Sequence, residues 1–317
     1  MKAVFLDFAT MGPDLDISAI RTLLPELEVF DMTEDDQLAE RIRGAAFVLA
    51  NKIRLTDELL HDNPELRFIG LTATGTDNVD LPAAKRFGVA VCNIRGYCTQ
   101  SVAEHVFGSI LNLTHSLSRF DAAVRSGEWQ HAETFSLLSY PVRELSRMTL
   151  GIIGYGELGK RVAEIGVAFR MNVIVCARPG ATTVDENRVS FDELLQRSDV
   201  ISLHCPLNDA TRELFSDAEF ENMKSSAILI NTARGGLVDS AALATALGTG
   251  QIAAAAVDVL PKEPPVDGDP LLDYAGDNLM VTPHIAWASN AARQNAIDEL
   301  AANIAAFLKG EERNRIV

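Results

Sequence analysis

The amino-acid sequence predicts an α/β fold built of two doubly wound parallel-sheet domains. Short β-branched runs alternate with longer helical patterns along the whole chain, which is typical of parallel sheets with helices on both faces. A break near Tyr97 divides this alternation into two series. With 317 residues, 47% of them hydrophobic, the chain is long enough to fill the cores of two domains.

The first series contains five strand-like runs. They are KAVFLDF, LEVFDM, AAFVLAN, LRFIGLTA and GVAVCNI, with helical segments such as DQLAERIRG between them. This sheet lacks a late helix to cover it, so we expect the closing segment, SNAARQNAIDELAANIAAFLKG, to return as one amphipathic helix and pack there. We therefore predict a flavodoxin-like domain of residues 1–98 plus 288–317.

A long helix is expected to open the second series. Ser101 and Glu104 have capping-box spacing, and an apolar stripe continues from there to about Arg125. Such a helix is longer than a single small domain usually requires.

Six strand-like runs follow this helix. They are MTLGIIGYG, MNVIVCA, DVISLHC, AILINTA, AAAAVDVL and NLMVTPHIA. Between them, Ser216 and Glu219 again have capping-box spacing. Six strands match the count of a Rossmann dinucleotide-binding domain, which we predict over residues 99–287.

The composition excludes some classes of partner. With 28 basic against 44 acidic residues the formal net charge is −16, so we expect neither nucleic acid nor an anionic membrane as a partner. The N-terminus lacks a signal-peptide pattern and no apolar run reaches about 18 residues, which favours a cytoplasmic protein. Cys92, Cys98, Cys176 and Cys205 form no CxxC pair, so we expect reduced thiols and no metal site.

A glycine-rich turn stands at the start of the second series. Gly154, Gly156 and Gly159 form G-x-G-x-x-G between the apolar run LGII and the helical KRVAEIGVAF. Glycine serves the tight turn itself, close approach of the backbone to a pyrophosphate, and packing of helix on strand. We interpret the turn as a dinucleotide site; the alternative is a glycine-rich turn without a ligand.

The next strand ends without an acidic residue. In MNVIVCARPG, the place of the acid that holds the adenosine ribose of NAD falls on Ala177, which neither binds the ribose nor repels the 2′-phosphate of NADP. Arg178 follows it and offers a planar cation suited to a phosphate. We therefore favour NADP over NAD. Alternatively, Arg178 is a solvated turn residue and another group holds the ribose.

Three ionisable residues follow strand-like runs of the second series: Arg234, Glu263 and His284. The carboxyl ends of parallel strands are where ligands bind, so we expect the three side chains to meet in one crevice. His284 can donate a proton near neutral pH, Glu263 would fix its tautomer, and Arg234 would polarise a carbonyl and bind a carboxylate. Taken singly, each also has a bland interpretation, as a surface arginine, a turn glutamate or a capping histidine.

The order and spacing of several motifs resemble the D-isomer-specific 2-hydroxyacid dehydrogenase family. These motifs are GIIGYGELG, HCPLNDATREL, LINTARGGLVD, AAVDVLPKEPP and TPHIAWAS, and in the first domain LTATGTDNVDLPAAKRFGVAVCNIRGYCTQSVAEH. The resemblance covers nearly the whole chain. HIAWAS and the ARPGA region are most similar to the glycerate dehydrogenase and hydroxypyruvate (glyoxylate) reductase branch.

The resemblance implies reduction of a small 2-oxo acid to the D-2-hydroxy acid by a nicotinamide cofactor, and the reverse oxidation. His284 would give the proton to the substrate oxygen, and Arg234 would orient the substrate. A non-catalytic dinucleotide sensor or corepressor-like protein on the same fold is the alternative. Family dimers also imply a homodimer with an arm near Trp129, which is otherwise plain interface packing.

The resemblance also assigns binding residues. For the substrate they are Lys52, Thr74, Gly75, Thr76, Arg234 and His284. Lys52 is alternatively a solvated lysine, and residues 74–76 are alternatively an ordinary β-turn. For the cofactor they are Gly154, Tyr155, Gly156, Glu157, Leu158, Gly159, Ala177, Arg178, His204, Cys205, Pro206, Thr211, Thr232, Ala233, Arg234, Asp258 and His284. Asp258 would receive the nicotinamide carboxamide, or else would cap the end of its strand. The family's NAD-preferring members carry Asp or Glu where this sequence has Ala177, which puts NAD specificity in doubt.

Overall fold

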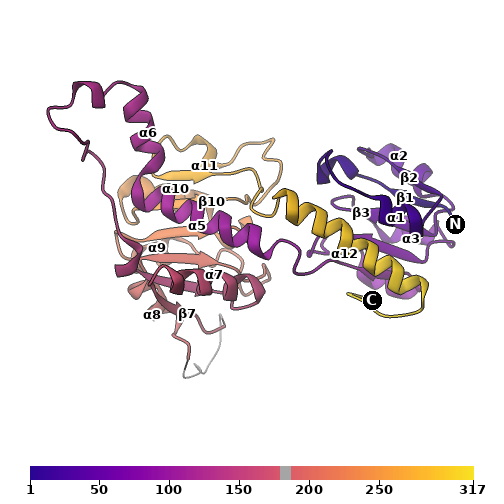
Figure 1. Ribbon diagram of the computed structural model, residues 1–317. Helices are drawn as coiled ribbons and strands as arrows, with labels where there is room; N and C mark the ends of the chain where they lie inside the picture. Colours follow the sequence, from indigo (N-terminus) through magenta and orange to yellow (C-terminus); the bar gives the residue numbers. More distant parts are fainter. Residues whose placement is uncertain (179–186) are drawn as a thin grey trace. The chain divides into compact units, whose positions relative to one another are not determined.

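The computed structural model describes residues 1–178 and 187–317, and the predicted fold class is confirmed. The chain forms two compact units, Met1–Cys98 with Ala288–Val317, and Thr99–Trp287. Each unit holds one parallel sheet with a hydrophobic core of its own (Figure 1). None of the helices in the described part of the chain is long and apolar enough to cross a membrane.

The first unit is built on a five-stranded sheet of order β2-β1-β3-β4-β5, which is the flavodoxin-like order. Its strands are β1 (Ala3–Phe5), β2 (Leu27–Val29), β3 (Phe47–Ala50), β4 (Phe68–Leu71) and β5 (Ala90–Cys92). Its helices are η1 (Phe8–Met11), α1 (Ser18–Leu23), α2 (Asp35–Ile42), α3 (Asp57–His61), α4 (Leu81–Phe87) and α12 (Asn290–Leu308). The five predicted strands are confirmed, and they pair with one another in parallel.

The closing helix α12 belongs to the first unit, as predicted. It begins after Ser289, whose Oγ accepts a hydrogen bond from Ala292 N at 3.2 Å. Its apolar face buries Ile297, Leu300 and Ile304 completely and packs against α1 and β4. The helix thus covers a sheet that the first 98 residues leave open.

The second unit is built on a six-stranded parallel sheet, in the order β11-β10-β9-β8-β6-β7 among the described residues. Its strands are β6 (Thr149–Ile153), β7 (Asn172–Val175), β8 (Val200–Leu203), β9 (Ile228–Asn231), β10 (Ala254–Val257) and β11 (Leu279–Val281). Its helices are α5 (Thr99–His115), α6 (Leu117–Arg125), η2 (Trp129–His131), η3 (Leu145–Arg147), α7 (Glu157–Ala168), α8 (Phe191–Arg197), α9 (Asp217–Asn222), η4 (Gly235–Leu237), α10 (Ser240–Thr249) and α11 (Pro270–Asp273).

The strand order of the second unit is that of a dinucleotide-binding domain in which the third strand is reduced to a single bridge. Beyond β7, Val189 pairs in parallel with Cys176 through an isolated bridge. In the Rossmann order 3-2-1-4-5-6 this is the place of the third strand. The order reverses between β6 and β8, which puts the switch point, where such domains bind ligands, beside the glycine-rich turn.

Two helix predictions have opposite outcomes. The capping box at Ser216 is confirmed, because Glu219 Oε2 accepts from Ser216 N at 3.0 Å. The capping box at Ser101 is wrong, since α5 already begins at Thr99 and the Ser101 hydroxyl instead donates to Ala286 O at 2.7 Å. A hydroxyl inside a helix turn is free to bind another segment.

The single long helix predicted up to Arg125 is also wrong, because the chain forms α5 and α6 with a break between them. Ser116 at the break has a left-handed backbone, with φ of 53°, which no continuous α-helix accommodates. Its hydroxyl donates to Pro141 O at 2.9 Å, and this contact fixes the bend. Beyond the bend, α6 and the segment that follows project from the rest of the unit (Figure 1).

Candidate active site

The glycine-rich turn joins β6 to α7, and each of its glycines meets a different demand. Gly154 has φ of +93°, and a Cβ there would lie 2.4 Å from the backbone of His204 and Cys205. A Cβ on Gly159 would lie 2.0 Å from Gly154 O. Gly156 has no heavy atom within 4 Å of its would-be Cβ and starts α7 without a side-chain cap. The unprotected helix N-terminus suits a pyrophosphate.

Two buried polar atoms at neighbouring strand ends lack protein partners. Within the described residues, neither His204 Nδ1, beyond β8, nor Thr232 Oγ1, beyond β9, has a hydrogen-bond partner. His204 Nε2 lies 2.8 Å from Ser202 Oγ, and burial lowers the pKa of the imidazole to about 4, so it is neutral. Together with the open face at Gly156, these orphaned atoms fit a bound dinucleotide.

Among the described residues, the end of β7 carries no negative charge. Ala177 is buried there and Arg178 is exposed. Burial raises the pKa of the Cys176 thiol to about 11, so the thiol is neutral as well. The rest of the Val173–Thr183 stretch, from Pro179, lies outside the described residues. The predicted absence of an acid at this strand end therefore holds for the residues that the structure describes.

The sequence did not single out Arg188, which lies at the same strand end. Its Nη1 donates to Cys176 O at 2.9 Å, and its guanidinium carbon lies 5.9 Å from the centre of the Tyr155 ring. No motif in the sequence marks it, and its place becomes visible only through the bridge between the next residue, Val189, and Cys176. A second cation thus stands between the glycine-rich turn and β7.

The three ionisable residues predicted to carry chemistry follow three adjacent strands. Arg234, Glu263 and His284 come after β9, β10 and β11, which are neighbours in one parallel sheet and therefore end at the same edge. Arg234 is exposed, and its Nη1 donates to Ala233 O at 2.8 Å. A Cβ on Gly235 would lie 2.0 Å from the backbone of Leu260, so glycine lets the loops after β9 and β10 touch.

Glu263 and His284 form a close pair. His284 Nδ1 lies 2.5 Å from Glu263 Oε2, and the other carboxylate oxygen accepts from Leu260 N at 2.8 Å. The two side chains are 32% and 31% exposed. Because Nδ1 faces the carboxylate, the pair fixes the imidazole orientation and leaves Nε2 for a substrate.

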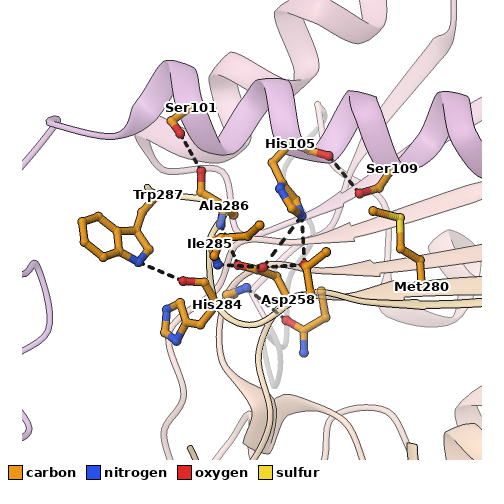
Figure 2. Close-up of polar contacts among 12 residues, drawn as sticks. Ser101, His105, Ser109, Asp258, Met280, His284, Ile285, Ala286 and Trp287 are labelled. Carbon is orange, nitrogen blue, oxygen red and sulfur yellow. Dashed lines mark hydrogen bonds and ion pairs between the residues drawn. The ribbon is translucent and has the colours of Figure 1, made fainter. Parts of the chain in front are cut away.

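Asp258 organises the backbone around His284. Its carboxylate is buried and accepts hydrogen bonds from Thr282 Oγ1 at 2.5 Å, Ile285 N at 2.9 Å and Ala286 N at 2.9 Å (Figure 2). His284 itself has φ of 56°, a left-handed conformation that is uncommon outside glycine. Asp258 therefore has the geometry of a strand-end cap, the alternative named above. Its contact with a carboxamide stays a prediction.

His105 on α5 is a second residue that the sequence did not single out. Its Nε2 lies 3.2 Å from Thr282 Oγ1 and 3.8 Å from Asp258 Oδ1 (Figure 2). A lone histidine in an apolar helix carries no motif, and only the fold brings it to the end of β10.

The other predicted cofactor residues of this unit lie around the same edge of the sheet. Thr211 holds the loop after β8, because its hydroxyl donates to Pro206 O at 2.7 Å. Glu157, in the first turn of α7, accepts from the Thr99 hydroxyl. Tyr155 is 39% exposed, and Leu158 is partly buried. The structure gives Thr211 and Glu157 protein partners, so their ligand contacts remain predictions.

The predicted substrate residues Lys52, Thr74, Gly75 and Thr76 lie in the loops after β3 and β4 of the first unit. The buried carboxylate of Asp7 accepts from the backbone N–H of Asn51 at 2.8 Å and of Lys52 at 2.6 Å. Asn93 Nδ2 donates to Thr74 O at 2.7 Å, and Thr74 Oγ1 donates to Ile94 O, beyond β5, at 3.0 Å. Both loops are therefore tied to strand ends, with the Lys52 side chain exposed.

Comparisons with known proteins point in one direction. A family model described as D-isomer specific 2-hydroxyacid dehydrogenase, NAD binding domain, matches residues 107–286. A glycerate dehydrogenase of Methylorubrum extorquens is 40% identical over 99% of this chain and 98% of its own. A hydroxypyruvate reductase of Blautia hydrogenotrophica is 35% identical over 99% of each chain. Among solved structures, an acyclic imino acid reductase in complex with NADPH and D-Arg superposes with a TM-score of 0.86 at 29% identity, over 100% of both chains.

Proposed function

The chain belongs to the D-isomer-specific 2-hydroxyacid dehydrogenase family, and from this premise we propose that it reduces glyoxylate or hydroxypyruvate to the D-2-hydroxy acid. Family membership makes it an oxidoreductase of CH–OH donors. The observation that carries the finer proposal is the Glu263–His284 pair, whose residues follow β10 and β11, beside the strand β9 that precedes Arg234. The names of the glycerate dehydrogenase and the hydroxypyruvate reductase support the choice of substrate.

Each of the three residues has one task in this proposal. A nicotinamide dinucleotide, when bound, supplies the hydride that reduces C2 of the 2-oxo acid. His284 Nε2 donates the proton to the carbonyl oxygen, while Glu263 holds Nδ1 at 2.5 Å and fixes the ring. Arg234, with its guanidinium exposed, binds the substrate carboxylate and stabilises the negative charge that develops on the oxygen.

The substrate is tested by initial rates of the wild-type protein. Glyoxylate, hydroxypyruvate, pyruvate and phenylpyruvate are each assayed with NADH and with NADPH. We expect the two small polar acids to have the highest kcat/KM. Dinucleotide binding without turnover of any 2-oxo acid would instead favour the non-catalytic sensor.

The mechanism is tested by His284→Ala. Loss of the proton donor is expected to lower kcat by about 100-fold or more. His61→Ala is the matched control, because His61 is an exposed histidine of the first unit that pairs with Asp62. A His284→Ala protein that keeps the wild-type rate would remove the residue from the mechanism.

We propose that NADPH is used at least as well as NADH. Support comes from the neutral Cys176 and Ala177 at the end of β7 and from the exposed Arg178 beyond them. Arg178→Gln should raise KM for NADPH much more than KM for NADH. Arg147→Gln is the control, because Arg147 precedes β6 at the opposite end of the sheet. Equal effects on both cofactors would refute the role of Arg178.

We further propose a homodimer that uses the segment beyond α5. Apolar side chains of this segment are left exposed: Leu117, Val124, Trp129, Phe135, Leu138 and Val142. Phe135 is 92% exposed and Leu138 86%, which is unusual for side chains of this size. Sedimentation should give a dimer for the wild type and a monomer for Phe135→Asp with Leu138→Asp. A monomeric wild type would contradict the proposal.

A further inference from the structure

His105 lies next to Asp258, on the side of α5 (Figure 2). Its side chain is 17% exposed, and it approaches Thr282 Oγ1 at 3.2 Å and Asp258 Oδ1 at 3.8 Å. Helix α5 makes a second link to the same segment, from Ser101 Oγ to Ala286 O at 2.7 Å. The helix therefore contacts the segment after β11 on both sides of His284.

The hydroxyl of Thr282 sets the direction of the hydrogen bonds. A threonine hydroxyl has one proton, and the 2.5 Å distance to Asp258 Oδ1 assigns that proton to the carboxylate. Towards His105, the Thr282 oxygen is therefore the acceptor. His105 must then carry a proton on Nε2, which gives a relay from His105 through Thr282 to Asp258.

The relay ends on the backbone that follows the proton donor. Asp258 accepts the N–H groups of Ile285 and Ala286, and its own carbonyl accepts from His284 N at 2.8 Å. His284 sits in a left-handed conformation, which persists only where the surroundings fix it. Whatever orients the Asp258 carboxylate consequently orients the His284 backbone.

We propose that His105 is a positioning residue of the active site, acting on His284 through Thr282 and Asp258. It touches neither substrate nor cofactor in this scheme. The inference rests on the proposed function insofar as His284 is the proton donor.

The test compares His105→Leu, which removes the donor, with His105→Gln, whose side-chain N–H can replace the one on Nε2. Leucine is expected to lower kcat by about tenfold or more while KM for the 2-oxo acid changes less than about threefold. Glutamine should recover most of kcat. Ser109→Ala is the control, because the Ser109 hydroxyl donates to the backbone oxygen of His105 at 2.9 Å and not to its imidazole.

Amide hydrogen exchange at Ile285 and Ala286 gives a measurement that needs no turnover. It should accelerate by about tenfold in His105→Leu and return towards the wild-type rate in His105→Gln. Unchanged exchange would overturn the relay. Faster exchange with kcat unchanged in an active enzyme would reduce His105 to a structural role.

Two further results separate the possible failures. If the wild type reduces no 2-oxo acid, the proposed function fails, and the exchange rates still decide whether the relay exists. If His105→Leu does not fold, Thr282→Val interrupts the same relay and should show the same loss of kcat. A folded Thr282→Val protein with wild-type kcat and exchange would also overturn the proposal.

A separate observation concerns Arg188, at the other end of the sheet. Its guanidinium donates one hydrogen bond to Cys176 O and stands 5.9 Å from the Tyr155 ring. Within the described residues no carboxylate lies within 4.0 Å of it. The hydrogen bond to Cys176 O holds the guanidinium in place, and its other N–H donors can bind a ligand.

We infer that Arg188 binds the 2′-phosphate of NADPH alongside Arg178. In a dinucleotide-binding domain the 2′ position of the adenosine ribose meets the end of the second strand, which here is β7. Arg188 contacts the backbone at that end, whereas Arg178 is exposed. A planar guanidinium held in place binds a phosphate with two parallel hydrogen bonds.

Fluorescence titration measures this without catalysis. Arg188→Gln should weaken binding of NADPH and of 2′,5′-ADP by about tenfold and binding of NADH by less than about threefold. Arg147→Gln should change none of these. Equal weakening of NADPH and NADH, or no change in either, would overturn the assignment. A loss seen only in Arg178→Gln would give the phosphate to Arg178 alone.

Discussion

Each unit contains a buried aspartate that holds the loop of a neighbouring strand. Asp7, just beyond β1, accepts backbone N–H groups from Asn51 to Ile53, in the loop after β3. Asp258, at the end of β10, accepts those of Ile285 and Ala286, in the loop after β11. In both sheets the two strands are adjacent, so the carboxylate lies beside the loop that it binds.

The two aspartates differ in what else surrounds them. Asp7 depends on backbone donors, and burial raises the pKa of its carboxyl group against the opposing effect of those donors. Asp258 accepts two backbone N–H groups and the Thr282 hydroxyl, and the His105 imidazole lies 3.8 Å from its Oδ1. The carboxylate with these side-chain neighbours is the one that holds a left-handed histidine. Side-chain contacts thus accompany the backbone conformation that is harder to maintain.

The largest expected effect comes from Asp258→Asn. The amide cannot accept at both oxygens, so Ala286 N or Ile285 N loses its partner and the His284 segment shifts. We expect kcat to fall by about 100-fold, since a displacement of about 1 Å at a reacting group is enough. Asp239→Asn is the control, because Asp239 caps α10 and asparagine caps a helix equally well. Near-wild-type kcat in Asp258→Asn would show that turnover does not need the hydrogen bonds from Ile285 N and Ala286 N to this carboxylate.

A third buried ionisable group, His204, tests how burial acts on a base. Its folded pKa of about 4 lies below the ordinary 6.5, so the stability associated with its neutral form is present above pH 6.5 and is lost as the pH falls towards 4. The loss amounts to roughly 3 kcal/mol at about 1.4 kcal/mol per pH unit. Urea unfolding from pH 7 to pH 4 should show a steeper decline for the wild type than for His204→Gln. Parallel declines would mean that water reaches the imidazole.

Asp7→Asn should destabilise the first unit without abolishing turnover. The amide leaves one or two of the three backbone N–H groups unpaired, at a cost of about 1–3 kcal/mol in the free energy of unfolding. Because Asp7 holds the loop of Lys52 rather than the proposed proton donor, kcat should fall less than about tenfold. Asp80→Asn, at the N-cap of α4, is the control for urea unfolding. A loss of kcat as large as in Asp258→Asn would contradict the contrast between the units.

The smallest effect is expected in how the stability difference between the wild type and Asp7→Asn changes with pH. The folded pKa of Asp7 is raised, so its contribution to stability is fully present below the unfolded value of 3.8 and declines as the pH rises through the folded pKa. The free energy of unfolding of the wild type should therefore exceed that of Asp7→Asn most near pH 3.8, and this excess should shrink as the pH rises. A difference that grows with pH would mean that the backbone donors outweigh burial.

Much of the fold was predictable because it depends on local patterns. Alternating β-branched runs and amphipathic segments gave both parallel sheets and the returning helix, and Ser216 began its helix as predicted. The break at Ser116 and the true start of α5 were not predictable. They depend on hydroxyl contacts with Pro141 and Ala286, which lie 25 and 185 residues away along the chain.

The sequence by itself determined the residue types of the candidate site and their order along the chain. Parallel strands end at one edge, so Arg234, Glu263 and His284 could be placed on one side of a sheet from their positions alone. Tertiary structure decided how they are held. The roles proposed for His105 and Arg188 rest on contacts with Asp258, Thr282 and Cys176, and no short-range pattern encodes such contacts between distant segments.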